Sequence, residues 1–249
     1  MPKHISIAGK GGTGKTTIAA LLIRWLSEHG KAPILAIDAD PNANLNEALG
    51  VQVEGYIADI IAHVRTASPS PGMPKHRMVE YQLHDALTES DHVDLLVMGG
   101  PEGPGCYCLA NQLLRDFIDQ LRDSYAYLVM DNEAGMEHLS RRVAQDVDVM
   151  LITSDPTVRG IRSAGRLAKL AKSLELTVRD IYLVLNRATD EQLESLKSEV
   201  EATGLSLIGL VPSDDLITQY DIEGRPLIEL PADSPAYKAI SAIAERLQL

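Results

Sequence analysis

The sequence has few cysteines, no excess of positive charge and no long apolar run. Only Cys106 and Cys108 occur among 249 residues, which are too few for a disulfide framework. The formal net charge of -12 argues against a broad basic surface for nucleic acid, although a local patch would be compatible with it. No apolar stretch approaches the ~20 residues that span a bilayer. We therefore expect a cytoplasmic protein without nucleic-acid or stable membrane partners.

The composition is sufficient for one compact domain. Hydrophobic residues make up 45% of the chain, and α/β domains of this length are often undivided. The first residues lead directly into an apolar, β-prone run, so we expect no secretory signal peptide. Residues 67–76 are rich in proline and are predicted to form an exposed, mobile loop. Because neither a repeat nor a domain boundary is visible, we expect residues 1–249 to form a single domain.

Predicted strands and helices alternate along the chain. Strands are expected at residues 4–8, 33–38, 93–98, 126–131, 148–153, 180–186 and 207–211. Helices are expected at residues 15–28, 105–123, 137–146, 159–174, 191–203 and 234–247. This alternation predicts an α/β fold with a mostly parallel, doubly wound sheet that carries helices on both faces. Such sheets bind their ligands beyond the carboxyl ends of the strands.

A glycine-rich loop between the first strand and the first helix is the most informative segment. Residues 9–17 read Gly-Lys-Gly-Gly-Thr-Gly-Lys-Thr-Thr and match the phosphate-loop pattern G-x-x-x-x-G-K-[ST] of P-loop NTPases. Glycines let the backbone curl around a phosphate chain, and the helix N-terminus adds its positive dipole end. We expect Lys15 to reach the β- and γ-phosphates and the Thr16 hydroxyl to ligate Mg²⁺. The other nucleotide-binding residues predicted here are Gly11, Gly12, Thr13, Gly14 and Thr17.

Carboxylates follow two of the predicted strands. Asp38 and Asp40 lie at the end of the second strand, and Asp131 ends the fourth. Both positions fall where a parallel sheet binds its ligand. An apolar strand that ends in aspartate is the Walker B arrangement, in which the carboxylate holds the Mg²⁺ shell. A purely structural interpretation remains open for each, because aspartate also caps helices and begins turns.

Lys10 is a second lysine that an ordinary phosphate loop does not need. With it, residues 10–16 form a deviant Walker A motif that resembles the dimeric ATPase group of the nitrogenase iron protein and the septum- and plasmid-positioning ATPases. The resemblance implies that Lys10 crosses a homodimer interface and contacts the phosphates of the partner's nucleotide. It also implies that Asp40 orients the attacking water, while Asp38 supports Mg²⁺ through a water or orients its own loop.

Three further segments resemble parts of the same group. The run from Asp131 to Gly135 is similar to its second switch, which implies that the Gly135 amide senses the γ-phosphate. The remaining two follow the sixth and seventh predicted strands, and there the resemblance implies that adenine is bound by Asn186, Arg187, Pro212 and Asp214. From the pattern alone, Asn186 could equally well only end a strand. The preference for ATP over GTP rests on the resemblance.

Cys106 and Cys108 stand two residues apart in a segment that is rich in glycine and proline. Two thiolates can bind one soft or borderline metal ion, but they do not complete a four-coordinate site. Two such pairs that meet on a two-fold axis would form a Cys₄ site in a homodimer. The alternative is a pair of reduced thiols that pack as small hydrophobic groups.

The most specific resemblance involves this cysteine pair. Cys106-Tyr107-Cys108, the second-switch segment and Glu137-His138-Leu139-Ser140-Arg141 together resemble the nickel-insertion ATPases of anaerobic carbon monoxide dehydrogenase, of which a close relative serves acetyl-CoA synthase. The resemblance implies a homodimer that binds ATP or ADP, Mg²⁺ and Ni²⁺ (or Zn²⁺). It implies delivery of the metal to apo carbon monoxide dehydrogenase or acetyl-CoA synthase.

Other functions compatible with the phosphate loop fit the sequence less well. A positioning ATPase that cycles on membrane or DNA is disfavoured by the net charge and by the amphipathic tail, residues 237–247, which carries little positive charge. Related iron–sulfur carriers use a Cys-x-x-Cys pair or single interface cysteines instead of Cys-x-Cys. A small-molecule kinase would leave Lys10 and the two cysteines unexplained.

Overall fold

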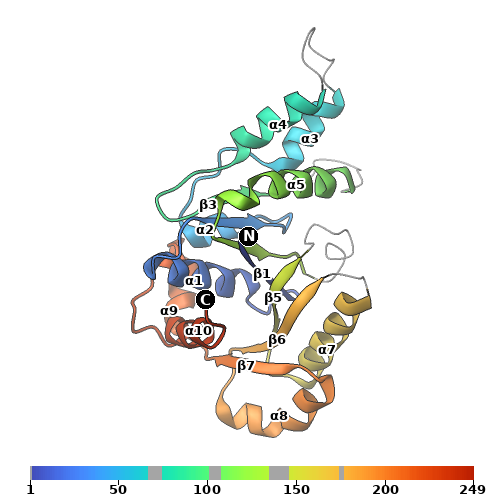
Figure 1. The fold of residues 1–249 in the computed structure, drawn as a ribbon. Coiled ribbons are helices and arrows are strands. Elements are labelled where there is room, and N and C mark those ends of the chain that lie inside the picture. Colours follow the sequence, from blue (N-terminus) through green and yellow to red (C-terminus); the bar gives the residue numbers. More distant parts are fainter. Residues whose placement is uncertain (1, 67–74, 101–107, 135–145, 174–176) are drawn as a thin grey trace.

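A computed structural model describes residues 2–66, 75–100, 108–134, 146–173 and 177–249. At its centre lies a seven-stranded parallel sheet with the order β3-β2-β4-β1-β5-β6-β7 (Figure 1). The strands are β1 (Lys3–Gly9), β2 (Ile34–Asp38), β3 (Asp94–Val97), β4 (Tyr127–Asp131), β5 (Val147–Ser154), β6 (Val178–Asn186) and β7 (Ser206–Val211). The expected fold class, a mostly parallel doubly wound sheet of the P-loop NTPase type, is thereby confirmed.

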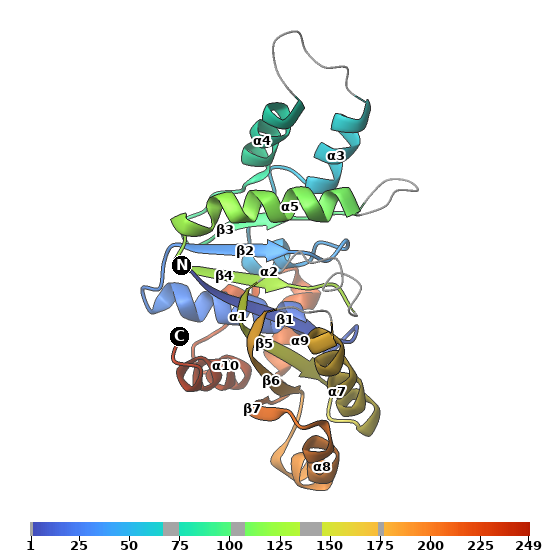
Figure 2. The same cartoon turned by 45° about the vertical axis from the view of Figure 1, so that its right-hand side comes forward.

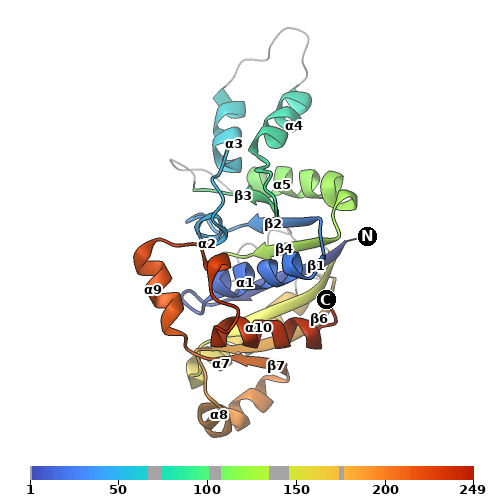
Figure 3. The ribbon, with the colours of Figure 1, turned by 90° about the vertical axis from the view of Figure 1, so that its left-hand side faces the viewer.

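Helices cover both faces of the sheet. One face carries α1 (Lys15–Glu28), α2 (Leu45–Leu49), α9 (Asp215–Glu223) and α10 (Pro235–Arg246), as Figure 3 shows. The other carries α3 (Ile57–Thr66), α4 (Lys75–Ala86), α5 (Cys108–Leu121), α7 (Val158–Ser173) and α8 (Asp190–Thr203). Two short 3₁₀ turns, η1 (Arg122–Ser124) and η2 (Leu227–Glu229), complete the described elements.

The two faces of the sheet pack into two separate apolar cores. Along β2, Ile34 and Ala36 belong to the core under α1 and α10, whereas Leu35 and Ile37 belong to the core under α5 and α7. Successive side chains of a strand point to opposite faces, so a sheet covered on both sides requires apolar residues at every position. This requirement explains why the central strands are continuous apolar runs in the sequence.

The predicted element bounds agree closely with the described ones. Helix α1 has the predicted limits, and α7 and α8 each begin one residue earlier than predicted. The helix expected at 105–123 is described from Cys108 and ends as an α-helix at Leu121, where η1 follows. The helix expected at 137–146 lies outside the described residues except for Asp146, which stands in a bend before β5.

Helices α2, α3, α4 and α9 were not predicted. Lys75 and His76, which were assigned to the proline-rich loop, form the start of α4, whereas residues 67–74 lie outside the described chain. Two of the missed helices are short, with five residues in α2 and nine in α9, so neither shows a full amphipathic repeat. Figure 2 shows α3 and α4 projecting beyond α5 at the β3 edge of the sheet. In the described part of the chain, no helix combines the length and the hydropathy that crossing a membrane requires.

Candidate nucleotide site

The phosphate loop lies where the carboxyl ends of five strands meet. It leaves the sheet after β1, which stands between β4 and β5. Strand register aligns the residues that follow: Asp38 of β2 is paired with Asp131 of β4, and Gly9 of β1 is paired with Thr153 of β5. The sheet therefore brings the predicted carboxylates to the same edge as the loop, as expected for a ligand site in a parallel sheet.

The glycines of the loop are required by its backbone and by its neighbours. Gly12 and Gly14 have φ values of 76° and 85°, in the left-handed region that favours glycine. A Cβ at Gly14 would also lie 2.1 Å from the Asn186 side-chain nitrogen, and one at Gly9 would lie 2.3 Å from the Thr153 hydroxyl oxygen. Helix α1 begins at Lys15 without a side-chain cap, which leaves its first amides available to an anion.

Thr16 and Asp131 form a partly buried pair of oxygen groups beside Lys15. The Thr16 hydroxyl donates to Oδ2 of Asp131 at 2.6 Å, and Lys15 is itself only 7% exposed. Within the described residues, the buried Oδ1 of Asp131 has no hydrogen-bond partner. A buried carboxylate oxygen without a partner costs free energy, and Mg²⁺ prefers oxygen ligands of this kind. The residues present therefore fit the Mg²⁺ that the phosphate-loop motif implies.

Both strand-end aspartates have raised pKa values. Burial raises the pKa of Asp131 to about 7, and the negative charges of Asp38 and Asp40 add to the effect, against the Thr16 bond and the Lys15 charge. Burial likewise raises the pKa of Asp38 to about 6, although the amides of Leu45 and Asp40 donate to its carboxylate. A bound cation would favour the charged forms of both groups. The electrostatics of the site are thus those of an acidic cluster that suits a cation.

Asp38 organises the loop that carries Asp40. Its Oδ1 accepts the amide of Asp40 at 3.0 Å, and its Oδ2 accepts the amide of Leu45 at 2.9 Å. Asp40 is partly exposed, and its Oδ1 accepts both the backbone and the side-chain nitrogen of Asn42. The loop after β2 is therefore shaped by its own carboxylates, with Asp38 inside and Asp40 at the surface.

Asn186 and Arg187, predicted to bind adenine, contact the phosphate loop. The Asn186 side-chain amide donates to the Thr13 carbonyl at 2.9 Å, and its Oδ1 accepts the Arg187 amide at 3.0 Å. The Arg187 guanidinium donates to the Gly12 carbonyl. Arg187 has a φ of 55°, so the chain turns sharply as it leaves β6. These contacts place both residues at the phosphate loop, and adenine binding by them stays a prediction.

Asp214 joins two helix starts. Its Oδ1 accepts the Leu216 amide and caps α9, and its Oδ2 accepts the Ser234 hydroxyl at 2.5 Å and the Ala236 amide at 3.2 Å. Pro212 directly follows β7, whose Val211 is paired with Asn186 of β6. The loop after β7 is therefore next to the loop after β6, while the Asp214 carboxylate is engaged by the protein itself.

Two predicted site residues lie outside the described chain. These are Gly135 and Cys106, and Cys108 is described only as the first residue of α5. Among the described side chains, no group of three or more histidine, cysteine, aspartate and glutamate residues could hold a metal ion. The switch role of Gly135 and the cysteine metal site accordingly remain predictions.

Sequence reasoning missed two polar residues of the site. Thr153, at the end of β5, hydrogen-bonds Thr13 of the phosphate loop, and the Asn132 side chain donates to the Ser6 hydroxyl and the Ile7 carbonyl. Both residues are buried and follow apolar runs. The signal available in the sequence was a polar residue at the carboxyl end of a buried strand. It led to the prediction of the aspartates and of Asn186, and it would also have found Thr153 and Asn132.

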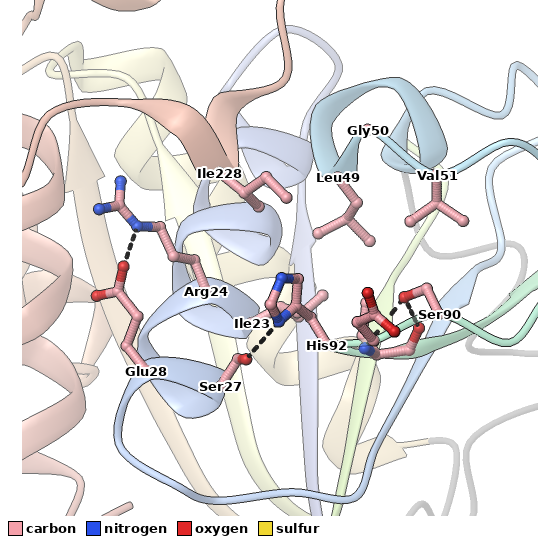
Figure 4. A pocket seen from close by; sticks show the side chains of 12 residues that line it. Ile23, Arg24, Ser27, Glu28, Leu49, Gly50, Val51, Ser90, His92 and Ile228 are labelled. Atoms are coloured by element: carbon pink, nitrogen blue, oxygen red, sulfur yellow. Dashed lines mark hydrogen bonds and ion pairs between the residues drawn. The ribbon is translucent and has the colours of Figure 1, made fainter.

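Two cavities lie along α1. One of about 810 Å³ opens beside Thr16 and Thr17, between α2 and α9, and has the size of a small-molecule site. The second, of about 260 Å³, lies along the C-terminal half of α1, where Ile23, Leu49 and Ile228 face one another (Figure 4). None of the predicted site residues lines the second cavity.

Comparison with known proteins agrees with this geometry. Residues 5–227 match the CobQ/CobB/MinD/ParA nucleotide binding domain family. The chain is 44% identical to an uncharacterized ATP-binding protein of Methanocaldococcus jannaschii, over 98% of this chain and 97% of that protein. It is 32% identical to the carbon monoxide dehydrogenase accessory protein CooC of Rhodospirillum rubrum, over 98% and 97% of the two chains. Among solved structures, the cell division ATPase MinD of Pyrococcus furiosus superposes with a TM-score of 0.75 at 25% identity, covering 100% of this chain and 99% of that chain.

Proposed function

The chain belongs to the CobQ/CobB/MinD/ParA nucleotide-binding family and is an ATPase, and we propose that it is a homodimeric metallochaperone that delivers Ni²⁺ to apo carbon monoxide dehydrogenase or acetyl-CoA synthase. The observation that carries the proposal is the similarity to the accessory protein of carbon monoxide dehydrogenase over 98% of the chain. The Cys-x-Cys pair at 106 and 108 supports it, because soft thiolates suit Ni²⁺ or Zn²⁺. The proposal treats residues 1–249 as one functional domain.

The described residues support ATP hydrolysis in named roles. Thr16 and Asp131 would hold Mg²⁺, which when bound neutralises charge on the β- and γ-phosphates. Lys15, buried at the start of α1, would contact the same phosphates. Asp40, partly exposed on a loop fixed by Asp38, would orient the attacking water. Phosphoryl transfer depends mostly on positioning and charge stabilisation, so this set is sufficient for hydrolysis.

Dimerisation would couple the nucleotide to the metal. Lys10 is exposed in the loop, so it is available to a second protomer, and in this proposal it contacts the partner's nucleotide. Closure of the dimer would bring two Cys106/Cys108 pairs into one Cys₄ site, and hydrolysis would loosen it. Bound nucleotide must then change the affinity for the metal by the same factor by which bound metal changes the affinity for the nucleotide.

The test is anaerobic equilibrium binding of Ni²⁺ per protomer. The proposal predicts one tightly bound ion per two protomers for the wild type and loss of this site in the Cys106→Ser/Cys108→Ser variant. A Lys197→Ala control, at an exposed position of α8, should bind as the wild type does. Binding that survives the double substitution, or no binding by the wild type, would remove the metal from the proposal and leave the ATPase.

A positioning ATPase is the second candidate, because the fold matches a cell division ATPase. Its membrane-bound form would need an exposed apolar helix face. In α10 that face is covered: Tyr237, Ile240 and Ile243 are at most 4% exposed and pack in the core shared with α1. The apolar face of α10 therefore packs on the domain. Pelleting with anionic liposomes or DNA in the presence of ATP tests this candidate, which predicts ATP-dependent sedimentation.

A further inference from the structure

Two buried threonine hydroxyls meet at the base of the phosphate loop. Thr13 of the loop is 2% exposed and Thr153 at the end of β5 is 1% exposed, and their Oγ1 atoms are 2.7 Å apart. Thr153 is paired in the sheet with Gly9, the first glycine of the motif. The proposed roles in phosphate, Mg²⁺ and water binding leave Thr153 without a task.

The hydrogen bonds of this pair have a direction. Each hydroxyl has one proton, and Thr13 donates its proton to the Lys10 carbonyl at 2.8 Å. Either hydroxyl could donate across the 2.7 Å contact, and the longer distance from Thr153 to the Ala8 carbonyl, 3.3 Å, favours the assignment in which Thr153 donates to Thr13. A chain of hydrogen bonds thus runs from Thr153 through Thr13 to the carbonyl of Lys10. Linked hydrogen bonds of this kind polarise and strengthen one another.

The chain fixes the backbone at Lys10. The Thr13 amide also donates to the Lys10 carbonyl, at 3.3 Å, so two groups of Thr13 hold this one oxygen. A Cβ at Gly9 would lie 2.3 Å from the Thr153 oxygen and 2.8 Å from the Thr13 oxygen, which shows how closely the pair covers the loop. The Lys10 side chain, by contrast, is exposed. The backbone of Lys10, which Thr13 and Thr153 connect to β5, therefore sets the direction in which the Lys10 side chain leaves the loop.

Other contacts keep the rest of the loop in place without Thr153. Asn186 holds the Thr13 carbonyl and Arg187 holds the Gly12 carbonyl, and both residues come from the end of β6. Removal of the Thr153 hydroxyl would leave the Thr13 hydroxyl, which holds the Lys10 carbonyl, without its partner on β5, while these two bonds remain. The loop would stay attached to the sheet, and the loss would be concentrated at Lys10.

We propose that Thr153 is a positioning residue of the ATPase: its hydroxyl, acting through Thr13, holds the loop backbone in the orientation from which the Lys10 amine reaches phosphate. This inference rests on the role of Lys10 in the proposed function and is independent of the metal. It predicts that hydrolysis depends on an atom that touches neither nucleotide nor water.

The test compares Thr153→Val, which keeps the shape and removes the hydroxyl, with Thr153→Ser, which keeps the hydroxyl. We expect Thr153→Val to lower kcat about tenfold, as loss of a buried hydrogen bond allows, with KM for ATP changed by less than about threefold. Thr153→Ser should recover kcat to within about threefold of the wild type. Thermal unfolding of both variants verifies that they are folded.

A double-mutant cycle with Lys10→Ala shows whether Thr153 acts through Lys10. Thr153→Val should lower kcat no further in the Lys10→Ala background, because the group that it positions is absent. Equal losses in the Val and Ser variants, an unchanged kcat in the Val variant, or a full additional loss in the Lys10→Ala background would each overturn the proposal. A Lys10→Ala variant with normal kcat would overturn the proposed role of Lys10 as well, whereas a slow Lys10→Ala beside a normal Thr153→Val overturns this inference alone.

Discussion

Asp131 shows how one residue connects burial, charge and ligand binding. It is the last residue of the interior strand β4 and is 1% exposed. Thr16 donates to one of its carboxylate oxygens, and the other oxygen has no hydrogen-bond partner among the described residues. Burial and the neighbouring carboxylates Asp38 and Asp40 raise its pKa to about 7. A group that is costly to ionise in the folded protein is stabilised by a bound cation. In its proposed role as a holder of Mg²⁺, the residue would link protein stability to Mg²⁺ binding.

The first prediction concerns the pH dependence of stability without nucleotide or Mg²⁺. Folded pKa values of about 7 for Asp131 and about 6 for Asp38 exceed the ordinary 3.8, so the folded protein keeps protons that the unfolded chain has lost. The contribution of these groups to the free energy of unfolding is largest below pH 3.8 and falls as the pH rises to about 7. Urea unfolding should show a decrease on the order of a few kcal/mol between about pH 5 and pH 8.

Asp131→Asn is the matched control for this pH dependence. It keeps the size of the side chain and removes the ionisation, so the decrease should be clearly smaller in the variant. Saturating Mg²⁺ and ADP should reduce the decrease in the wild type, because a cation favours the charged carboxylate. A decrease of the same size in wild type and Asp131→Asn would show that Asp131 does not cause it.

The second prediction concerns Gly14. Its φ of 85° and the Asn186 nitrogen 2.1 Å from the position of a Cβ both exclude a side chain. Gly14→Ala should weaken ATP binding more than about tenfold, because the loop and the start of α1 must shift. Gly30→Ala is the control: Gly30 has a φ of 66° but no atom within 4 Å of its Cβ position. It should cost about 1 kcal/mol of stability and leave ATP affinity unchanged in calorimetry.

At the scale of elements, the strands and five described helices, α1, α5, α7, α8 and α10, were predicted, whereas α2, α3, α4 and α9 were not. The central strands were visible because they are buried on both faces, as β2 shows. Helix α1 was visible because glycines precede it and a full apolar repeat runs along it. Helix α9 has weak amphipathicity, and its cap is Asp214, which the resemblance had assigned to the base. A cap and a ligand-binding carboxylate look the same in a sequence, and only the contacts of Asp214 with α10 reveal its structural bonds.

The third prediction belongs to this element. Asp214→Ala removes the cap of α9 and the bonds to Ser234 and Ala236, so it should lower the free energy of unfolding by roughly 1–3 kcal/mol. Asp215→Ala, an exposed neighbour in the same helix turn, should change it by less than about 0.5 kcal/mol. Urea unfolding measures both. Equal stability of the two variants would mean that Asp214 does not tie α9 to α10.

At the scale of the whole molecule, the sheet topology places the nucleotide site and leaves Lys10 exposed, where we propose that a second protomer binds. Strands β4 and β5 stand on either side of β1, so the chemistry-bearing ends of β2, β4, β5 and β6 surround the phosphate loop. The sequence could predict this convergence, because parallel sheets bind ligands at the carboxyl ends of strands. It could not predict the projection formed by α3 and α4, since that depends on packing against α5 instead of on a local motif.

The fourth prediction concerns assembly. Asp40→Ala should bind ATP but hydrolyse it at least about a hundredfold more slowly, because the water is no longer oriented. With ATP trapped in this way, the fraction of dimer should rise in analytical ultracentrifugation. The Lys10→Ala/Asp40→Ala variant should remain monomeric, since Lys10 is proposed to bridge the protomers. Equal dimerisation of the two variants would contradict the bridging role, and unchanged turnover of Asp40→Ala would remove Asp40 from the chemistry.

The central claim is that ATP drives delivery of Ni²⁺ by the cysteine pair. The most direct measurement is anaerobic activation of nickel-free carbon monoxide dehydrogenase by the Ni²⁺-loaded protein, with and without MgATP, followed as CO oxidation. The account predicts activation that requires ATP and is lost in the Cys106→Ser/Cys108→Ser and Lys10→Ala variants. Activation of the same size without ATP, or with the double cysteine variant, would contradict it.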